Sequence, residues 1–259
     1  MSKNNRHGDS MPFSVSQNFF TSRATIKRLL RITSIGKEDR VVEIGAGKGH
    51  ITKELVKICR EVTAFEIDKE LIEYLRKNFR EFENLRILHQ DFLKYSMPKG
   101  KYKVFSNMPF SLTSQIMRKL VLADNPPTEA WLFMEKGAAK RFLGSPNESL
   151  TSIYIKPFFE LEIKYYFLRS DFHPMPSVDI VLVHLAKRIS PDIPFEQQKS
   201  FIRFVKRGLK YGINCELTKR QAAAALRLAG LPGIKQSGTM LYVQWLCLFR
   251  CYYRFYGNK

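Results

Sequence analysis

The chain of 259 residues carries 43 lysines and arginines against 24 aspartates and glutamates, a formal net charge of +19. With 44% hydrophobic and 26% charged residues, its composition is that of a folded globular protein and excludes a disordered chain. No apolar run approaches the roughly 18 residues of a membrane span, and the polar N-terminus lacks the apolar segment of a secretory signal. The four cysteines match neither a disulfide framework nor a zinc pattern. We expect a soluble, cytoplasmic protein without a metal site that binds a polyanion rather than a membrane.

Strands and helices alternate along the first half of the chain. The hydrophobic pattern predicts, in order, a helix over 25–32, a strand over 41–44, a helix over 50–57, a strand over 62–67, a helix over 69–79, strands over 85–88 and 102–106, a helix over 113–122, a strand over 130–133 and a helix from 136. Such alternation is typical of βαβ units and predicts an α/β fold with a mainly parallel, Rossmann-like sheet.

The pattern then changes twice. The runs 158–168 and 178–186 read as strands with no helix between them, which predicts an antiparallel pair at the edge of the sheet. A linker rich in proline, 190–194, follows, and beyond it the pattern predicts only helices, over 195–209, 219–228 and 240–253. We therefore expect two domains, residues 1–187 and a small all-helical domain over 188–259.

Positive charge is concentrated in the second of these domains. From Lys187 to the end of the sequence there are 14 basic and three acidic residues. Arg203, Lys206, Arg207 and Lys210 follow one another at three- and four-residue spacing and would share one face of a helix. Such a field attracts phosphate backbones or anionic membranes, although a solvated lysine-rich surface would look similar. We favour RNA because the motifs below point to it independently.

A glycine-rich turn, 43–49, connects the strand over 41–44 to the next helix. Glycines there allow a tight turn and a close approach of a ligand. Glu66 ends the next strand, where its carboxylate can accept hydrogen bonds from two ribose hydroxyls, and Asp91 follows the third strand, where it can accept one from an adenine amine. Both lie at the carboxyl edge of the sheet, which is the ligand crevice of open α/β folds.

The details of this turn favour S-adenosylmethionine over a dinucleotide. His50 stands where the dinucleotide pattern GxGxxG requires glycine, and Lys48 is followed by glycine rather than by the Ser or Thr of a phosphate-binding loop. The carboxylates Glu43, Glu66 and Asp91 suit a sulfonium cation better than a pyrophosphate. An NAD-dependent enzyme remains the alternative.

A second motif, Asn107-Met108-Pro109-Phe110, closes the strand over 102–106. Pro109 holds Met108 in an extended conformation, so that the Asn107 side chain and the Met108 carbonyl could accept hydrogen bonds from an exocyclic amine. The ring of Phe110 would stack on the base. Phe172, in a stretch stiffened by two prolines (172–176), could clamp the other face of an extruded base, although a core position is as consistent with its sequence.

These motifs, in this order and spacing, resemble the rRNA adenine N6-methyltransferases. That family includes the macrolide-resistance (Erm) enzymes and the housekeeping small-subunit dimethyladenosine transferases. The motifs that carry the resemblance are Gln17-Asn18-Phe19-Phe20, Glu43 through Gly49, Glu66-Ile67-Asp68, Asp91-Phe92, Asn107-Met108-Pro109-Phe110 and Phe172-His173-Pro174-Met175-Pro176.

The resemblance implies a Rossmann-like methyltransferase domain with a helical, RNA-binding C-terminal domain, and it assigns roles to residues. Asn18 and the Phe20 backbone would contact the methionine end of the cofactor, Ile67 and Phe92 would flank its adenine, and Asn107 would lie between cofactor and target. The implied cofactor-binding set is Gln17, Asn18, Phe20, Glu43, Gly45, Gly47, Gly49, Glu66, Ile67, Asp91, Phe92 and Asn107. The implied catalytic set is Asn107, Met108, Pro109, Phe110 and Phe172.

Two segments look like the Erm branch, namely Trp131 through Arg141 and Tyr242 through Arg250. The branch implies a single adenine of 23S rRNA as target, presented in protein-free RNA or an early assembly precursor, and resistance to macrolides, lincosamides and streptogramin B. We expect a monomer whose RNA contacts are Lys136, Lys140, Arg141, Arg203, Lys206, Arg207 and Lys210.

Two alternatives stay open. One is the housekeeping enzyme that acts on small-subunit rRNA, and the other is a nucleic-acid-binding relative without catalytic activity, against which the intact Gly45, Glu66, Asp91 and Asn107 argue. The family usually has an aliphatic residue and a tyrosine where Met108 and Phe110 stand, so the number of methyl groups added is left open.

Overall fold

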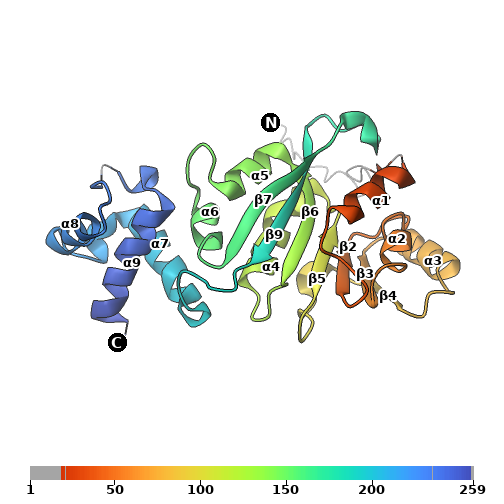
Figure 1. Ribbon diagram of the computed structural model, residues 1–259, viewed down its shortest axis with the longest axis horizontal. Helices are drawn as coiled ribbons and strands as arrows, with labels where there is room; N and C mark the ends of the chain where they lie inside the picture. The colour runs from red at the N-terminus through yellow and green to blue at the C-terminus, as the bar shows by residue number, and fades with distance from the viewer. Residues whose placement is uncertain (1–18, 21, 235, 258–259) are drawn as a thin grey trace, which may run out of the picture.

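A seven-stranded sheet in the order β4-β3-β2-β5-β6-β9-β7 forms the centre of the computed structural model, which describes residues 19–257 except 21 and 235 (Figure 1). A two-stranded ribbon, β1-β8, accompanies it. The strands are β1 (Phe19–Phe20), β2 (Arg40–Ile44), β3 (Glu61–Glu66), β4 (Leu85–His89), β5 (Lys103–Ser106), β6 (Glu129–Glu135), β7 (Phe159–Tyr166), β8 (Phe172–His173) and β9 (Ile180–Lys187). The helices are α1 (Arg23–Arg31), α2 (Thr52–Leu55), α3 (Lys69–Asn78), α4 (Thr113–Leu122), α5 (Lys136–Leu143), α6 (Leu150–Ile155), α7 (Gln198–Tyr211), α8 (Lys219–Leu228) and α9 (Tyr242–Tyr256).

The expected α/β architecture is confirmed. Strands β4, β3, β2, β5 and β6 pair in parallel, whereas β9 pairs antiparallel with both β6 and β7 at the edge of the sheet. The parallel register brings the carboxyl ends of β2, β3, β4 and β5 to one edge. The loops that carry the expected cofactor and catalytic residues therefore meet there.

Two helices depart from the expectation by more than a few residues at their ends: one is much shorter than expected, and one was not expected. The helix expected over 50–57 is reduced to the four residues of α2: the preceding glycine turn continues to His50, and residues 56–58 form turns after the helix. Helix α6 was not predicted. It is only six residues long, too short for a periodic pattern, and a capping box between Ser149 and Ser152 begins it.

The chain changes from sheet to helices between Lys187 and Gln198, around the proline-rich segment predicted as a linker. Helices α7 and α9 pack through aromatic side chains. Gly208 of α7 lets Trp245 of α9 approach closely, since a Cβ there would lie 2.7 Å from Trp245 Cζ3. Figure 1 shows these helices at one end of the molecule, beyond α6 and β7. Among the described helices, none is long and apolar enough to cross a membrane.

Candidate active site

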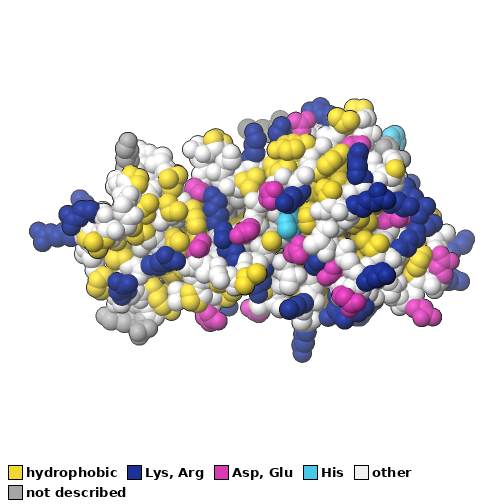
Figure 2. Space-filling model, viewed as in Figure 1, with side chains coloured by type: hydrophobic (Ala, Val, Ile, Leu, Met, Phe, Trp, Pro, Cys, Tyr) yellow, Lys and Arg dark blue, Asp and Glu magenta, His cyan; other side chains and the backbone are white. Residues whose placement is uncertain are grey.

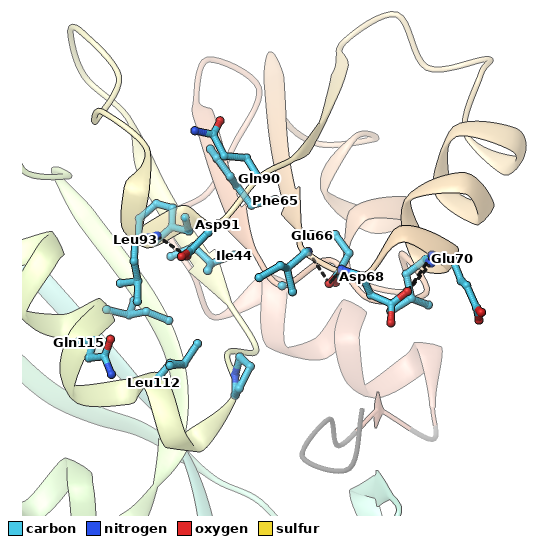
Figure 3. A pocket seen from close by; sticks show the side chains of 16 residues that line it. Ile44, Phe65, Glu66, Asp68, Glu70, Gln90, Asp91, Leu93, Leu112 and Gln115 are labelled. Carbon is cyan, nitrogen blue, oxygen red and sulfur yellow. Dashed lines mark hydrogen bonds between the residues drawn. The ribbon is translucent and has the colours of Figure 1, made fainter. Parts of the chain in front are cut away.

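A cavity of about 450 Å³ opens at the carboxyl edge of the parallel strands (Figure 3). Its walls come from the loops after β2, β3, β4 and β5 and from the first turns of α3 and α4. It is lined by Ile44, Gly45, Phe65, Glu66, Ile67, Asp68, Glu70, Leu71, Gln90, Asp91, Phe92, Leu93, Pro109, Leu112, Gln115 and Ile116. Four of these described lining residues are carboxylates and none is a lysine or arginine.

The glycine turn lines this cavity through Gly45, and its backbone is tightly folded. Gly45 has φ +76°, a conformation that favours glycine, and the N–H groups of Gly45 and Ala46 both donate to the Phe65 carbonyl, at 2.9 and 3.0 Å. A Cβ on Gly45 would lie 3.6 Å from the carbonyl oxygen of Asn107. The turn therefore lies against the second motif, and a side chain at residue 45 would strain the turn because of its positive φ.

Glu66 connects the end of β3 to the same turn. The residue is 2% exposed, and its Oε2 accepts a hydrogen bond from Gly47 N at 2.8 Å. Its Oε1 accepts from the N–H groups of Ile67 and Asp68, at 2.7 and 3.0 Å. A carboxylate has about four acceptor positions, so Glu66 keeps capacity for a ligand hydroxyl while three backbone donors hold it in place.

Glu43 lies behind the turn and, unlike Glu66, is a buried carboxyl group with a raised pKa. It is 1% exposed, and its Oε2 has no hydrogen-bond partner in the part of the chain that the structure describes. Burial raises the pKa of Glu43 to about 8, with a further contribution from the charge of Glu66, while contacts with Thr52 oppose the rise. Glu43 is thus mainly protonated at neutral pH, and it does not line the described cavity. It supplies less negative charge than its sequence position suggested.

Asp91 and Phe92 form the opposite wall. Asp91 Oδ1 accepts from Leu93 N at 2.9 Å and begins a single 3-10 turn, and the Phe92 ring packs edge-on against Phe65 at 5.5 Å. Figure 3 shows the carboxylates of Asp91 and Glu66 on opposite sides of the cavity. This separation suits the two ends of a nucleoside.

Lys119 of α4 supports this wall, although the sequence pattern did not single it out. Its Nζ donates to the carbonyl oxygens of Leu93 and Tyr95, at 2.9 and 2.6 Å, and lies 5.6 Å from the centre of the Phe92 ring. Burial lowers the pKa of Lys119, and the negative charge of Asp91 opposes that shift. Gln115 lies one turn earlier on the same helix and lines the cavity. The spacing of residues 112, 115, 116 and 119 could have indicated this face of α4.

The segment Asn107 to Phe110 lies next to the cavity, as expected. The Ser106 hydroxyl donates to the Ile44 carbonyl at 2.9 Å, which fixes the end of β5 beside the end of β2. Asn107 is half-buried, the Met108 side chain is buried, and Pro109 lines the cavity. Phe110 is half-buried against the core that includes Phe105. Met108 can therefore contribute to the site only through its backbone.

Phe172 is more enclosed than a base clamp requires. It is 2% exposed in strand β8, and its ring packs against Phe167 at 5.2 Å. Stacking on a base would need this ring to be uncovered, so the clamp stays a prediction. Gln17 and Asn18 lie outside the described residues, and for Phe20 the structure describes only the backbone, in β1.

The basic residues expected to contact RNA lie on two helices. Lys140 and Arg141 are exposed on α5 and Lys136 is half-buried at its start. Arg203, Lys206, Arg207 and Lys210 are all exposed on α7, opposite its buried face, so the predicted shared face is confirmed. Arg207 forms an ion pair with Glu216, which neutralises part of this surface.

Comparison with known proteins assigns the family. A family model described as ribosomal RNA adenine dimethylase matches residues 8–211. The chain belongs to this family. A protein of Lysinibacillus sphaericus named rRNA adenine N-6-methyltransferase is 35% identical over 243 residues, which cover 93% of this chain and 97% of that protein. One of the same name from Staphylococcus aureus is 35% identical over 246 residues, covering 93% and 97%.

Solved structures agree with the family in fold. The 23S rRNA methyltransferase ErmE superposes with a TM-score of 0.77 at 26% identity, covering 90% of this chain and 99% of that one. A dimethyladenosine transferase from Plasmodium falciparum has a TM-score of 0.71 at 21% identity, covering 91% and 97%, a likeness of fold alone. The confirmed fold is thus the Rossmann-like methyltransferase fold with a helical C-terminal region.

The chain is an rRNA adenine N6-methyltransferase of this family, and S-adenosylmethionine is its methyl donor. The cavity fits that donor, because its described lining offers carboxylates to ribose hydroxyls, an amine and a cation, and no basic side chain to a pyrophosphate. Glu66, Asp91 and Phe92 could hold it. When bound, S-adenosylmethionine supplies the methyl group and leaves as S-adenosylhomocysteine.

Proposed function

We propose that the protein methylates N6 of a single adenine of 23S rRNA in the cytoplasm, and that this modification confers resistance to macrolides, lincosamides and streptogramin B. The observation that carries the proposal is the likeness to the 23S rRNA methyltransferase ErmE over nearly the full length of both chains. The segments Trp131 through Arg141 and Tyr242 through Arg250, which resemble the resistance branch, support it. We propose that the protein acts as a monomer.

The proposed chemistry assigns one task to each part of the cavity. Glu66 holds the ribose hydroxyls, and Asp91 accepts from the adenine amine of the cofactor. The Asn107 side chain and the Met108 carbonyl accept from the two N–H groups of the target N6, which makes its lone pair available for attack. As the new C–N bond forms and the C–S bond breaks, the nitrogen gains positive charge and its proton becomes acidic. No strong general base is then required. Phe110 stacks on the target base.

The two proposed domains divide the work. Residues 1–187 bind the cofactor and carry out the transfer, and residues 188–259 add RNA affinity through the exposed basic face of α7. Helix α5 begins directly after β6, which lies two strand positions from β2 in the sheet. Its basic residues Lys136, Lys140 and Arg141 would therefore contact RNA close to the reaction site.

Separated ribosomal RNAs test the proposal. Methyl transfer from labelled S-adenosylmethionine is measured on protein-free 23S rRNA and, in parallel, on small-subunit rRNA. The proposal predicts transfer to 23S rRNA alone, and reduced susceptibility to a macrolide in a sensitive bacterium that expresses the protein. Transfer to small-subunit rRNA alone would assign the protein to ribosome biogenesis instead.

A further inference from the structure

An exposed tyrosine stands beside the reaction edge of the sheet and belongs to none of the sites described above. Tyr166 ends strand β7 and is 60% exposed, whereas its half-buried neighbour Tyr165 packs against the core, with its ring 4.8 Å from that of Phe167. Leu168 and Met175, 71% and 65% exposed, lie in the loops that follow. An aromatic ring left in solvent at such an edge is available for stacking.

A lysine lies near this ring, and an arginine shares the carboxylate that holds the lysine. Lys136 Nζ lies 5.6 Å from the centre of the Tyr166 ring. Asp179 holds Lys136 through two contacts, since its carbonyl accepts from Lys136 N at 2.8 Å and its Oδ2 lies 3.8 Å from Nζ. Its Oδ1 also lies 3.1 Å from Arg169 Nη2. A single carboxylate thus contacts both Arg169 and Lys136, the lysine that lies near the exposed ring. Figure 2 shows dark blue and yellow side chains together over this end of β7 and β9.

The strand register relates this ring to the reaction site. Asn107 directly follows Ser106, which pairs with Leu132 of β6, while Tyr166 pairs with Val181 of β9 and, across it, faces Met134 of β6. Tyr166 is therefore three strands from Asn107, and at about 4.8 Å per strand the lateral separation is roughly 14 Å. That distance spans a few nucleotides of single-stranded RNA, so a chain with its target adenine at Asn107 can reach Tyr166.

We propose that Tyr166 is a stacking platform for a nucleobase that flanks the target adenine, with Lys136 and Arg169 binding the adjacent phosphates. The proposal rests on an rRNA substrate and holds for either subunit RNA. Combined aromatic and cationic side chains are the common means of holding single-stranded nucleic acid, because every base has a face that stacks and every linkage carries a negative charge. Asp179 is one carboxylate shared by two cations, Lys136 and Arg169, so the surface keeps a net positive charge. Such a surface suits a phosphate backbone better than a protein partner.

Three variants test the ring. Y166A removes it, Y166F keeps it without the hydroxyl, and Y74A removes an exposed tyrosine of α3 that lies outside the described cavity. Affinity for the rRNA fragment that the wild type methylates is measured by fluorescence anisotropy, together with kcat, KM for RNA and the Kd for S-adenosylmethionine. We expect Y166A to raise the RNA Kd and KM between about fivefold and a hundredfold. Y166F and Y74A should behave as the wild type, and the cofactor Kd should not change.

A base analogue locates the contact. With 2-aminopurine placed singly at each of the four positions on either side of the target, the wild type should quench its fluorescence at one flanking position by stacking, and Y166A should not. The proposal is overturned if Y166A binds and methylates RNA as the wild type does, if Y166F is as impaired as Y166A, or if Y166A loses cofactor binding or thermal stability, since the ring would then be structural. A wild type inactive on 23S rRNA but active on the other RNA would contradict the proposed function and leave this test intact.

Discussion

The backbone N–H of Gly47 donates a hydrogen bond to Glu66 Oε2 at 2.8 Å. This contact joins the glycine turn after β2 to the end of β3, so the residue proposed to hold the ribose also holds the turn. Because the two functions share one carboxylate, the shape of the cavity and its affinity for the cofactor are coupled.

Glu66→Gln should weaken the binding of S-adenosylmethionine and also lower the stability of the fold. The amide keeps the volume of the carboxylate but turns an NH₂ toward at least one of the three backbone donors, and loss of such a buried hydrogen bond costs about 1–3 kcal/mol. We expect the Kd for S-adenosylmethionine to rise about tenfold or more by calorimetry. Glu73→Gln, on an exposed part of α3, is the matched control and should bind normally. Normal binding by the Glu66 variant would contradict the assignment.

Glu43 predicts a pH dependence of stability. Its pKa is raised from 4.5 to about 8 by burial, so the folded protein retains a proton that the unfolded chain has released. The free energy of unfolding should therefore decrease as pH rises from about 4.5 to about 8 and then level off, by up to about 1.4 kcal/mol per pH unit. Glu43→Gln should lack this slope in urea unfolding between pH 5 and 8. Parallel profiles for variant and wild type would exclude a protonated Glu43.

Lys119 is expected to act as a positioning residue for the wall that carries Asp91 and Phe92. Lys119→Met removes the hydrogen bonds to the Leu93 and Tyr95 carbonyls but keeps the length of the side chain. We expect the Kd for S-adenosylmethionine to rise about tenfold, with kcat at saturating cofactor nearly unchanged. Arg118→Met, on the exposed side of α4, should leave cofactor binding as it is. A fall in kcat alone would show that Lys119 acts elsewhere.

The ion pair of Arg207 with Glu216 predicts unequal contributions from the basic face of α7. Neutralising Lys206 and Lys210 to glutamine should weaken RNA binding and reduce the slope of log Kd against log salt by about one for each phosphate that is no longer neutralised. Arg207→Gln should change the slope less, because Glu216 already compensates its charge. An unaltered slope for Lys206 and Lys210 together would indicate a merely solvated surface.

Much of the fold could be predicted from the sequence because buried strands and amphipathic helices alternate in it. The edge pair β7 and β9 was visible for the same reason, since no helical pattern separates the two runs. Residues at strand ends, such as Glu66 and Asp91, could be placed because parallel strands bring their carboxyl ends together. Helix α6 is too short to leave a periodic signal.

Contacts between elements that are distant in the sequence could not be predicted from its hydrophobic pattern. Which face of α4 turns toward the cavity depends on its packing, so Gln115 and Lys119 were missed. The protonation of Glu43 depends on its complete burial, which a pattern does not reveal. Phe172 could be read equally as core or as clamp, and its enclosure by Phe167 becomes visible only in three dimensions.

The central claim is tested most directly by locating the methyl group. Wild-type protein and Asn107→Ala are incubated with S-adenosylmethionine and protein-free 23S rRNA, and primer extension then maps the modified base. We predict a stop at one adenine for the wild type, and for the variant a loss of transfer of about 100-fold or more with RNA binding nearly retained, because Asn107 acts on the amine and not on phosphates. Transfer by Asn107→Ala at the wild-type rate, or no stop on 23S rRNA for the wild type, would contradict the account.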